Sequence, residues 1–594
     1  MLAELEERKS MEVQKPPIRI SVPQISLQRL SYCDGSVSGF ESWAKKLPMA
    51  NVGVAAKMLF QATRELTSAP MAANSRYKML EIIRSQTYII CEALSKRFLK
   101  QSVMLTDNDL KIVSLAQTLQ NQLASGYKRI ILDELAQPIK KSENKLLTFA
   151  IHRAISDLSQ TILRAFQLYS KPPKNAWLEL HQLYALAEAK GIFSYPVKDS
   201  RAKYIASSSI LDVYIRALLL GCCKPNQLRQ LDLANLYAAT ELWSGSVKIC
   251  SSSDVKALFL FSQHKDFTPV YRTLLKTSNT ASRALSPTDL VTALQSHLDK
   301  ESSDITVPAN ISETVIIHLV HAWGAMVERS FRRTDNSGDI QIGIGLLASH
   351  YFSAGEMSLP FLLHQWNADE PKEKAPAPST DVWDKSFDAG SQFVGEPENI
   401  EFDSIAFISS NAEETEDTGP KGKQLKAEIF NTSPGGYGIS LDNPPNSVQT
   451  GELLVIKEAR MTNWSLGCIR WIRTQRNLPT QLGIELLAPK VESVAVRILN
   501  KTGENGEYLR GISVPALPAA GQEESLILPT MPFKVGCKAQ LLNDKHGQRI
   551  QLLKRMNTSR SFVQYTFQPL TQVLSSSTSK DDSGDEFASI WDKL

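Results

Sequence analysis

The sequence predicts a multidomain α + β protein in which a long helical half precedes a β-rich half. Three observations predict this fold class. Apolar residues recur at three- to five-residue steps from about residue 39 to 333, as the buried face of a helix requires. From about residue 424 to 570, alternating runs separated by turn residues are typical of antiparallel strands. The length of 594 residues is also too great for one hydrophobic core.

Composition and charge favour a soluble globular protein. Apolar residues make up 42% of the chain, charged residues 22%, and the net charge is +4, which argues against a DNA- or RNA-coating protein. The longest apolar helix candidate, residues 205–223, carries Asp212 and Arg216, so we expect a buried helix and no membrane span. Residues 1–15 do not resemble a signal peptide, and the seven cysteines form no CxxC pair. A reducing, cytoplasmic location is therefore expected.

The helical half is predicted to contain two segments. Residues 1–30 should form a flexible arm, because a charged stretch runs into Pro16 and Pro17. Residues 31–325 should form an all-α domain with irregular, solenoid-like helix packing. Its helices are expected over residues 77–99, 110–123, 145–169, 177–190, 209–220 and 227–243.

The β-rich half is predicted to contain three segments. Residues 326–500 should contain β-strands, which the family resemblance given below implies form a β-barrel. A disordered insertion should interrupt them at about 364–420, because eight acidic residues and no basic residue lie between positions 396 and 420. Residues 501–572 should form a small β extension with a hairpin turn at 543–547. Residues 573–594 should form an acidic tail in which a short helix is possible.

A cluster of arginines lies where the last long helix passes into the first strand of the β-rich half. Arg329 and Arg333 are four positions apart in an RxxxR pattern, with Arg332 between them. The planar guanidinium group matches phosphate oxygens, or guanine O6 and N7, with two parallel hydrogen bonds and also stacks on purine rings. These arginines are therefore candidates to bind a nucleotide.

A second pattern, NxSxxG, lies between two predicted strands. Asn431 and Ser433 supply an amide and a hydroxyl, which bond base or phosphate edges. Gly435 and Gly436 allow a positive φ angle and a close backbone approach. Neither pattern contains a general base directed at a water molecule, so binding is expected and catalysis is not.

Together the two patterns resemble the PilZ family of bacterial cyclic di-GMP receptors. That family pairs an RxxxR linker with a [D/N]xSxxG turn on a six-stranded antiparallel barrel, and its later strands resemble residues 464–471 and 481–486 here. The resemblance covers about residues 326–350 and 421–490. It implies a cyclic di-GMP receptor that acts in surface attachment, pilus or motility behaviour, or exopolysaccharide control. The implied ligand-binding residues are Arg329, Arg332, Arg333, Asn431, Ser433, Gly435 and Gly436.

The chain departs from the family in the spacing of the two patterns. Between Arg333 and Asn431 the numbering advances by 431 − 333 = 98, where the family has about one hairpin. We interpret residues 340–348 as the first barrel strand and residues 351–420 as an insertion at a hairpin tip, which loop-closure entropy tolerates. The acidic insertion also raises the hypothesis that it covers the arginines in the absence of ligand.

Two alternatives remain open at the level of sequence. The barrel could have lost nucleotide binding, which would leave a scaffold that recruits partners through its helical domain and tail. In the tail, Phe587, Ile590, Trp591 and Leu594 share one helical face, which suits either docking on an unidentified protein partner or packing on the chain's own domain. No cofactor or metal site is expected, because His318, His321 and His350 lack further ligands at suitable spacing.

Overall fold

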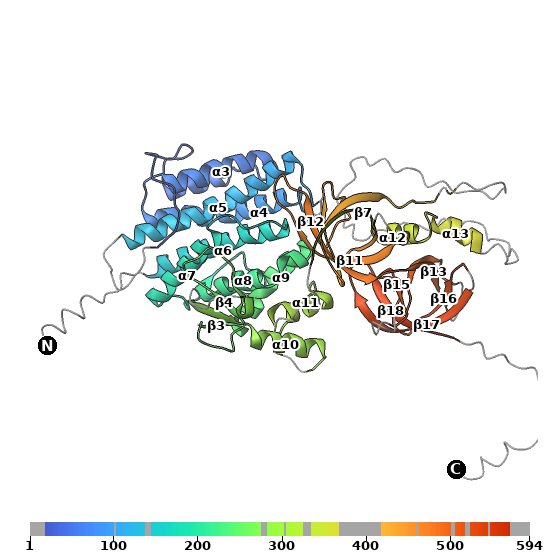
Figure 1. Ribbon diagram of the computed structural model, residues 1–594. Coiled ribbons are helices and arrows are strands. Elements are labelled where there is room, and N and C mark those ends of the chain that lie inside the picture. The colour runs from blue at the N-terminus through green and yellow to red at the C-terminus, as the bar shows by residue number, and fades with distance from the viewer. Residues whose placement is uncertain are drawn as a thin grey trace, which may run out of the picture. The chain divides into compact units, whose positions relative to one another are not determined.

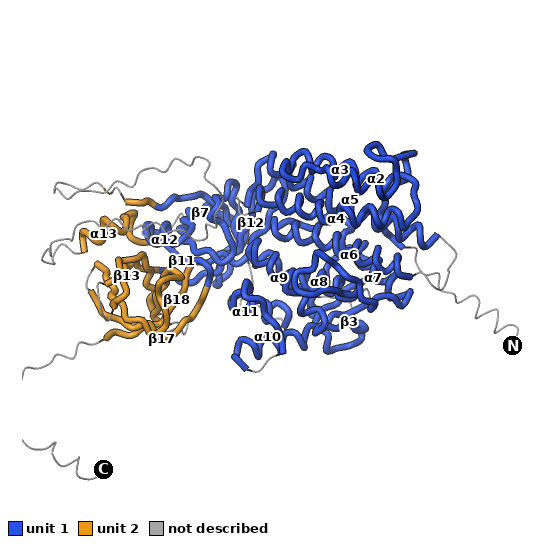
Figure 2. The backbone as a smooth tube through the Cα atoms, turned by 180° about the vertical axis from the view of Figure 1, so that it is seen from behind, with its two compact units in different colours: residues 1–352, 422–490, 559–561 blue, residues 353–421, 491–558, 562–594 orange. Residues whose placement is uncertain are grey.

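The computed structural model describes most of the chain (Figure 1). The described residues are 18–99, 103–136, 144–274, 282–301, 304–324, 334–366, 417, 419–458, 461–500, 505–516, 523–544 and 547–570. Two compact units are coloured in Figure 2. The first comprises residues 1–352, 422–490 and 559–561, and the second comprises residues 353–421, 491–558 and 562–594.

The first unit begins with the predicted helical domain, and all six expected helices are present. Their apolar residues join one shared core that runs through the domain, and α6 is buried on nearly every side. Two helices start with a capping box: Thr106 with Asp109, and Ser209 with Asp212. The helices are α2 (Val37–Ala44), α3 (Val52–Ser68), α4 (Ala73–Ser95), α5 (Asp107–Leu135), α6 (Asn144–Gln167), α7 (Ala176–Lys190), α8 (Ile210–Cys222), α9 (Gln230–Trp243), α10 (Thr288–Leu298) and α11 (Glu313–Trp323).

The domain is not purely α, which the sequence did not predict. A four-stranded antiparallel sheet of order β3-β6-β4-β5 lies between α9 and α10 in the sequence, and a two-stranded ladder joins β1 to β2. These strands have two to four residues, too few for alternation to be distinguished from a loop. They are β1 (Val197–Lys198), β2 (Ser207–Ser208), β3 (Lys248–Ser251), β4 (Phe259–Phe261), β5 (Val270–Tyr271) and β6 (Arg283–Ser286).

A network of buried charges crosses the helical core. The guanidinium group of Arg84 donates two hydrogen bonds to the carboxylate of Asp199, at 2.6 and 3.0 Å, while Arg153 pairs with both Glu81 and Asp199. Only 4% of the Arg84 side chain and 10% of the Asp199 side chain are exposed. Because buried charges are stable only when paired, these residues join α4, α6 and the segment after β1.

Two buried histidines should make the helical domain acid-sensitive. Burial lowers the pKa of His152 to about 3 and that of His181 to about 4. The pKa of an unfolded histidine is about 6.5, so the neutral buried histidines stabilise the folded state fully above that pH. Below it, the free energy of unfolding should fall by about 1.4 kcal/mol per pH unit for each histidine. Urea unfolding at pH 7.5, 6 and 5, followed by circular dichroism, measures this slope.

The contribution of one histidine can be isolated. His181→Gln should flatten the slope between pH 6 and 5, whereas His297→Gln, on the exposed side of α10, should leave it unchanged. An equal slope in wild type and His181→Gln would show that His181 does not titrate with unfolding.

The predicted six-stranded barrel completes the first unit. It closes in the order β10-β11-β12-β9-β8-β7, with antiparallel neighbours and a core of Ile, Leu and Val side chains. The first strand and its partner form a hairpin, so the long insertion does lie at a hairpin tip. The strands are β7 (Thr334–Ile344), β8 (Gln424–Ser433), β9 (Gly436–Leu441), β10 (Leu453–Glu458), β11 (Ser465–Arg473) and β12 (Thr480–Ala488).

The bounds of the first barrel strand differ from the prediction of 340–348. β7 begins at Thr334 and ends at Ile344, and α12 (Leu346–Ser353) follows directly. Gly345, with a φ angle of 93°, lies between the strand and the helix, and this backbone conformation ends the strand. The bulk of the insertion, residues 367–416, lies outside the described residues, and so does the hypothesis that it covers the arginines.

The second unit contains a second closed barrel, where the sequence predicted only a small β extension. Its order is β13-β14-β15-β18-β17-β16, and the predicted hairpin at 543–547 is present, with Leu542 paired to Gly547. The barrel starts at Glu492, inside the range assigned to the first barrel. Its strands are β13 (Glu492–Ile498), β14 (Leu509–Val514), β15 (Ser525–Leu528), β16 (Lys538–Leu542), β17 (Gly547–Thr558) and β18 (Val563–Pro569).

One helix of the insertion packs on this second barrel. Leu359, in α13 (Leu359–Trp366), is buried with Ala495 and Leu542. Asp417 accepts a hydrogen bond of 2.8 Å from the backbone N–H of Ser358, just before the helix. Among the described helices of both units, none combines the length and apolar character that a membrane span needs.

Candidate functional site

The NxSxxG residues form the end of β8 and the turn into β9. Ser433 is paired with Gly436, so the turn consists of Pro434 and Gly435. The hydroxyl of Ser433 donates to the carbonyl of Gly436 at 3.3 Å, and the carbonyl of Gly435 accepts from Leu486 N–H at 3.0 Å. The first bond closes the turn, and the second connects the turn to the neighbouring strand β12 and so holds its backbone in place.

Gly436 occupies a position that only glycine fits. Its φ angle is 146°, a region that other residues rarely adopt. A Cβ atom there would lie 2.0 Å from the backbone oxygen of Ile484. The close approach of β9 to β12 therefore depends on this glycine.

The start of the first barrel strand lies beside the same turn. In the β7–β8 ladder, Thr334 is paired with Thr432, which lies between Asn431 and Ser433. Thr334 directly follows the predicted arginine segment in the sequence. Arg329, Arg332 and Arg333 themselves lie outside the described residues.

Two β-bulges frame the outer face of the barrel next to this turn. In β8, Phe430 and Asn431 lie opposite Gly438, and in β11, Arg470 and Trp471 lie opposite Gly483. The two glycines are paired with each other across β9 and β12. Both alternate with inward-facing core residues, so they point outward. Bulges commonly redirect side chains near functional sites.

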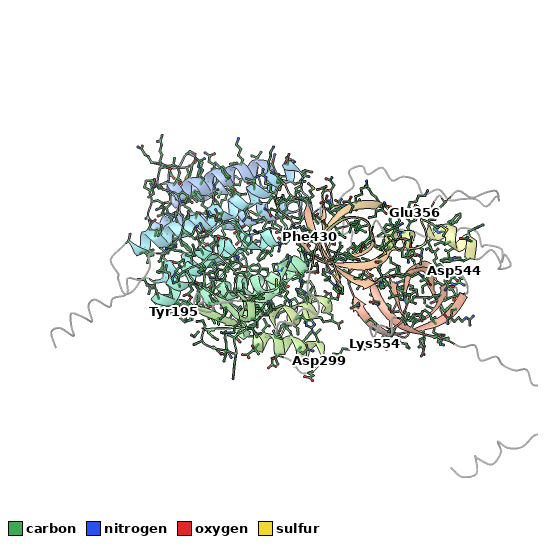
Figure 3. The ribbon with its side chains drawn as sticks, in the orientation of Figure 1. Tyr195, Asp299, Glu356, Phe430, Asp544 and Lys554 are labelled. Carbon is green, nitrogen blue, oxygen red and sulfur yellow. The ribbon has the colours of Figure 1, made fainter. Side chains whose placement is uncertain are left out.

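The glycines leave space that neighbouring side chains occupy. A Cβ atom on Gly438 would lie 2.5 Å from Asn431 Oδ1 and 2.7 Å from the Phe430 ring, and one on Gly483 would lie 1.7 Å from the Trp471 ring. Two aromatic side chains and the predicted asparagine thus gather around a backbone floor; Figure 3 labels Phe430. Phe430 was not among the site residues predicted from the sequence. The available signal was its position directly before Asn431 of the NxSxxG pattern.

Charges near the turn are partly neutralised. Arg470 forms an ion pair with Glu485 on the outer face. The hydroxyl of Tyr437 donates to Glu458 at 2.9 Å, and burial together with this carboxylate raises the pKa of Tyr437 to about 12. Tyr437 is therefore a neutral donor at physiological pH.

The barrel and the helical domain are connected within the first unit. Tyr169, just after α6, is 6% exposed and belongs to the barrel's apolar core. The backbone N–H of Thr474 donates to the carbonyl of Tyr169 at 3.0 Å, and its hydroxyl donates to Leu168 at 2.7 Å. Arg229 adds a 2.9 Å bond from Nε to the carbonyl of Thr450. The helical domain thus contributes a residue to the barrel core.

Tyr169→Ala should therefore destabilise the chain by about 3–5 kcal/mol, the usual cost of truncating a buried aromatic side chain. Tyr169→Phe keeps the ring and should cost about 1 kcal/mol. Chemical unfolding of the full chain measures both. Equal losses for the two variants would show that the ring is not what connects the domains.

Candidate metal ligands do not gather in the part of the chain that the structure describes: no group of three or more His, Cys, Asp or Glu side chains could hold an ion there. His318 bonds the carbonyl of Cys223 at 2.8 Å. The tail residues Phe587, Ile590, Trp591 and Leu594 lie outside the described residues, as does any docking by them.

Known proteins match nearly the whole chain. Residues 38–253 match the N-terminal domain of the cyclic-di-GMP receptor FimW, residues 258–492 its middle PilZ domain, and residues 494–570 its C-terminal β-barrel domain. The chain is 32% identical to the cyclic-di-GMP receptor FimW of Pseudomonas aeruginosa strain PAO1, over 98% of this chain and 100% of that protein. The chain belongs to the FimW family. No solved structure matches it significantly.

Membership of the FimW family confirms the PilZ resemblance, and the two closed barrels correspond to the middle and C-terminal domains of that family. Its middle domain begins at residue 258 and so includes the strands β4–β6 and the helices α10 and α11 as well as the barrel. Its C-terminal barrel domain begins at residue 494, within β13. The family is named for a receptor, that is, for a protein that binds a ligand.

Proposed function

We propose that this FimW-family chain is a cyclic di-GMP receptor that binds the dinucleotide between its RxxxR segment and the β8–β9 turn. Arg329, Arg332 and Arg333 would bind the phosphates and guanine edges, and Asn431 and Ser433 would bind from the turn. The relative from Pseudomonas aeruginosa carries the name of such a receptor. A reducing, cytoplasmic setting accords with the seven free cysteines.

The pairing of Thr334 with Thr432 carries this proposal. Nearly a hundred positions separate the two patterns, yet the first residue after the arginine segment is paired with Thr432, which lies between Asn431 and Ser433. Consecutive Cα atoms are about 3.8 Å apart, so the Cα atom of Arg333 lies about 4 Å from that of Thr334, and the Cα atom of Arg329 lies at most about 19 Å from it. A dianionic ligand on the turn is then within reach of several guanidinium groups.

The outer face of the barrel supports the same ligand. Guanine presents a flat aromatic face, and the rings of Phe430 and Trp471 lie over Gly438 and Gly483, respectively. Aromatic stacking on a base is worth about 1–3 kcal/mol in nucleic-acid complexes. Phe430 and Trp471 are the residues we add to the predicted ligand-binding set.

Calorimetry with cyclic di-GMP tests the proposal. Wild type should bind, and Arg329→Ala/Arg333→Ala should weaken binding about 100-fold or more, because two charge-assisted contacts to the dianion are lost. The matched control is Lys423→Ala/Lys426→Ala, which removes the same charge. Both lysines are exposed, Lys426 on β8 and Lys423 directly before that strand. This control should change the Kd by less than about threefold at 0.15 M salt.

The outcomes separate two functions. Binding that the arginine pair abolishes and the lysine pair preserves supports the receptor. An equal loss in both variants would assign the effect to net charge alone. If wild type releases no heat and shows no binding by a second method, the chain is a scaffold with a degenerate barrel.

We further infer that binding is transmitted to the helical domain. Tyr169 and the Thr474 bonds join that domain to the barrel core, so a change in barrel packing acts directly on α6. A ligand transmits a change only through differential affinity for two arrangements. Hydrogen exchange at residues 165–169 should therefore slow when cyclic di-GMP binds wild type, and Tyr169→Ala should abolish that response.

A further inference from the structure

The N-terminal arm lies as an extended segment on the helical domain. Along residues 18–22 the side chains alternate between partly buried and exposed, as in a strand with one covered face. Ile18 and Ile20 pack against the core of the domain, while Arg19 and Ser21 are exposed. This part of the predicted flexible arm is therefore ordered, and its aliphatic residues hold it in place.

Side chains of the domain bind the backbone of the arm. Glu179 accepts a 2.8 Å hydrogen bond from Ser21 N–H, and Gln182 accepts a 3.4 Å bond from Arg19 N–H. The two acceptors are three positions apart on α7 and so share one face of that helix. Arg129, on α5, donates to the carbonyl of Pro23.

These contacts have the form of peptide recognition. An extended peptide is bound through its main chain, which provides affinity for many sequences, while alternate side chains provide specificity. Here the main-chain bonds come from side chains on α5 and α7, and the aliphatic contacts come at every second residue. The face formed by α5, α6 and α7 therefore fits an extended segment with aliphatic residues at alternate positions.

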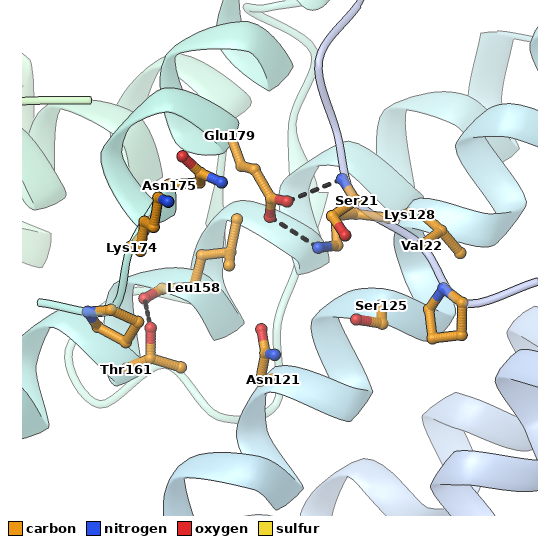
Figure 4. Close-up of a pocket in the computed structure, with 13 residues that line it drawn as sticks. Ser21, Val22, Asn121, Ser125, Lys128, Leu158, Thr161, Lys174, Asn175 and Glu179 are labelled. Atoms are coloured by element: carbon orange, nitrogen blue, oxygen red, sulfur yellow. Dashed lines mark hydrogen bonds and ion pairs between the residues drawn. The ribbon is translucent and has the colours of Figure 1, made fainter. Parts of the chain in front are cut away.

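The arm leaves part of this face unfilled. A cavity of about 350 Å³ lies beneath residues 21–23, lined also by Asn121, Ser125 and Lys128 from α5 (Figure 4). Glu179 stands at its edge and joins the arm to the domain, since it pairs with buried Lys128 at 2.7 Å and accepts from Ser21. The cavity has room for a longer side chain than the arm supplies.

We propose that this face is a binding groove for an extended peptide, that residues 18–23 occupy it in cis, and that a partner segment with aliphatic residues at alternate positions replaces them. The arm is suited to exchange because it adjoins the groove in the same chain and contributes only short side chains over the cavity. The groove lies apart from the dinucleotide site, so this proposal does not depend on cyclic di-GMP binding.

The test uses the full chain and the arm itself as the probe. Ile18→Asp/Ile20→Asp should release the arm, seen as faster hydrogen exchange over residues 18–23 with an unchanged circular dichroism spectrum. A fluorescent peptide of residues 18–28 should then bind the released variant at least about tenfold more tightly than wild type, because a tethered competitor acts at an effective concentration near millimolar. The same peptide with both aspartates should bind at least about tenfold more weakly.

A groove variant adds a control for specificity. In the released background, Arg129→Ala should weaken peptide binding about three- to tenfold, because a donor to the main chain is lost. Lys111→Ala, at an exposed position on the same helix, removes equal charge and should have no effect. The proposal is overturned if the arm does not exchange faster in the released variant. It is also overturned if that variant binds the peptide no better than wild type, or binds the aspartate peptide equally well.

Discussion

Gly436→Ala should raise the Kd for cyclic di-GMP about 100-fold, the effect of roughly 2.8 kcal/mol. The φ angle of Gly436 is 146°, and the new methyl group would lie 2.0 Å from the backbone oxygen of Ile484. Because that oxygen belongs to the backbone of the adjacent strand, the turn must move. Asn431 and Ser433 would then shift relative to Thr334, the first described residue after the arginine segment. Calorimetry on the folded variant measures the loss.

Gly338→Ala is the matched control on the same barrel. Gly338 lies in β7, and a Cβ atom there would meet nothing within 4 Å. We expect its Kd to stay within about threefold of wild type, a difference below 1 kcal/mol. If Gly436→Ala binds cyclic di-GMP as tightly as Gly338→Ala does, the β8–β9 turn does not form the ligand site.

Asp199→Asn should destabilise the chain by about 3–5 kcal/mol, the cost of leaving a buried charge without its partner. Asp199 accepts two hydrogen bonds from Arg84 and lies 3.3 Å from Arg153. An asparagine would leave two buried guanidinium groups with a neutral partner. Urea unfolding of the full chain at pH 7 measures the loss, with circular dichroism as the probe of the helical domain.

An exposed pair supplies the control. Asp289 pairs with Lys248 at 2.7 Å, but more than half of each side chain is exposed. Asp289→Asn should therefore cost at most about 1 kcal/mol. Equal losses for the two variants would show that the Arg84–Asp199 pair is no more important than a surface ion pair.

The pH dependence of the Asp199 effect follows from its pKa. Burial alone would raise the pKa of Asp199, but hydrogen bonds and charges from Arg84 and Arg153 hold it well below its ordinary value. A lowered folded pKa stabilises the protein above the unfolded value of about 3.9, and the stabilisation is lost as the pH falls below it. The difference between wild type and Asp199→Asn should therefore narrow below about pH 4.

Long periodic segments were predictable because their pattern is local. The helices from α4 to α9 and the strands β8, β9, β11 and β12 each show the period of their element as a repeat of apolar residues in the sequence. The closure of the second barrel was not predictable. It depends on β13 pairing with both β14 and β16, and those partners are chosen by three-dimensional packing.

The sequence by itself determined the residue types of the candidate site: arginines at four-residue spacing, an asparagine, a serine and two glycines. It also determined that the chain combines a helical half with a strand-rich half, because periodicity is a property of neighbouring residues, and its resemblance to the PilZ family implied the first barrel. Only the tertiary structure decided that Thr334 pairs with Thr432, that Phe430 and Trp471 lie over a pair of glycines, and that Tyr169 packs into the barrel core. Each of these contacts joins residues far apart in the sequence or depends on a bulge, and such contacts form when the whole barrel closes and buries its apolar face.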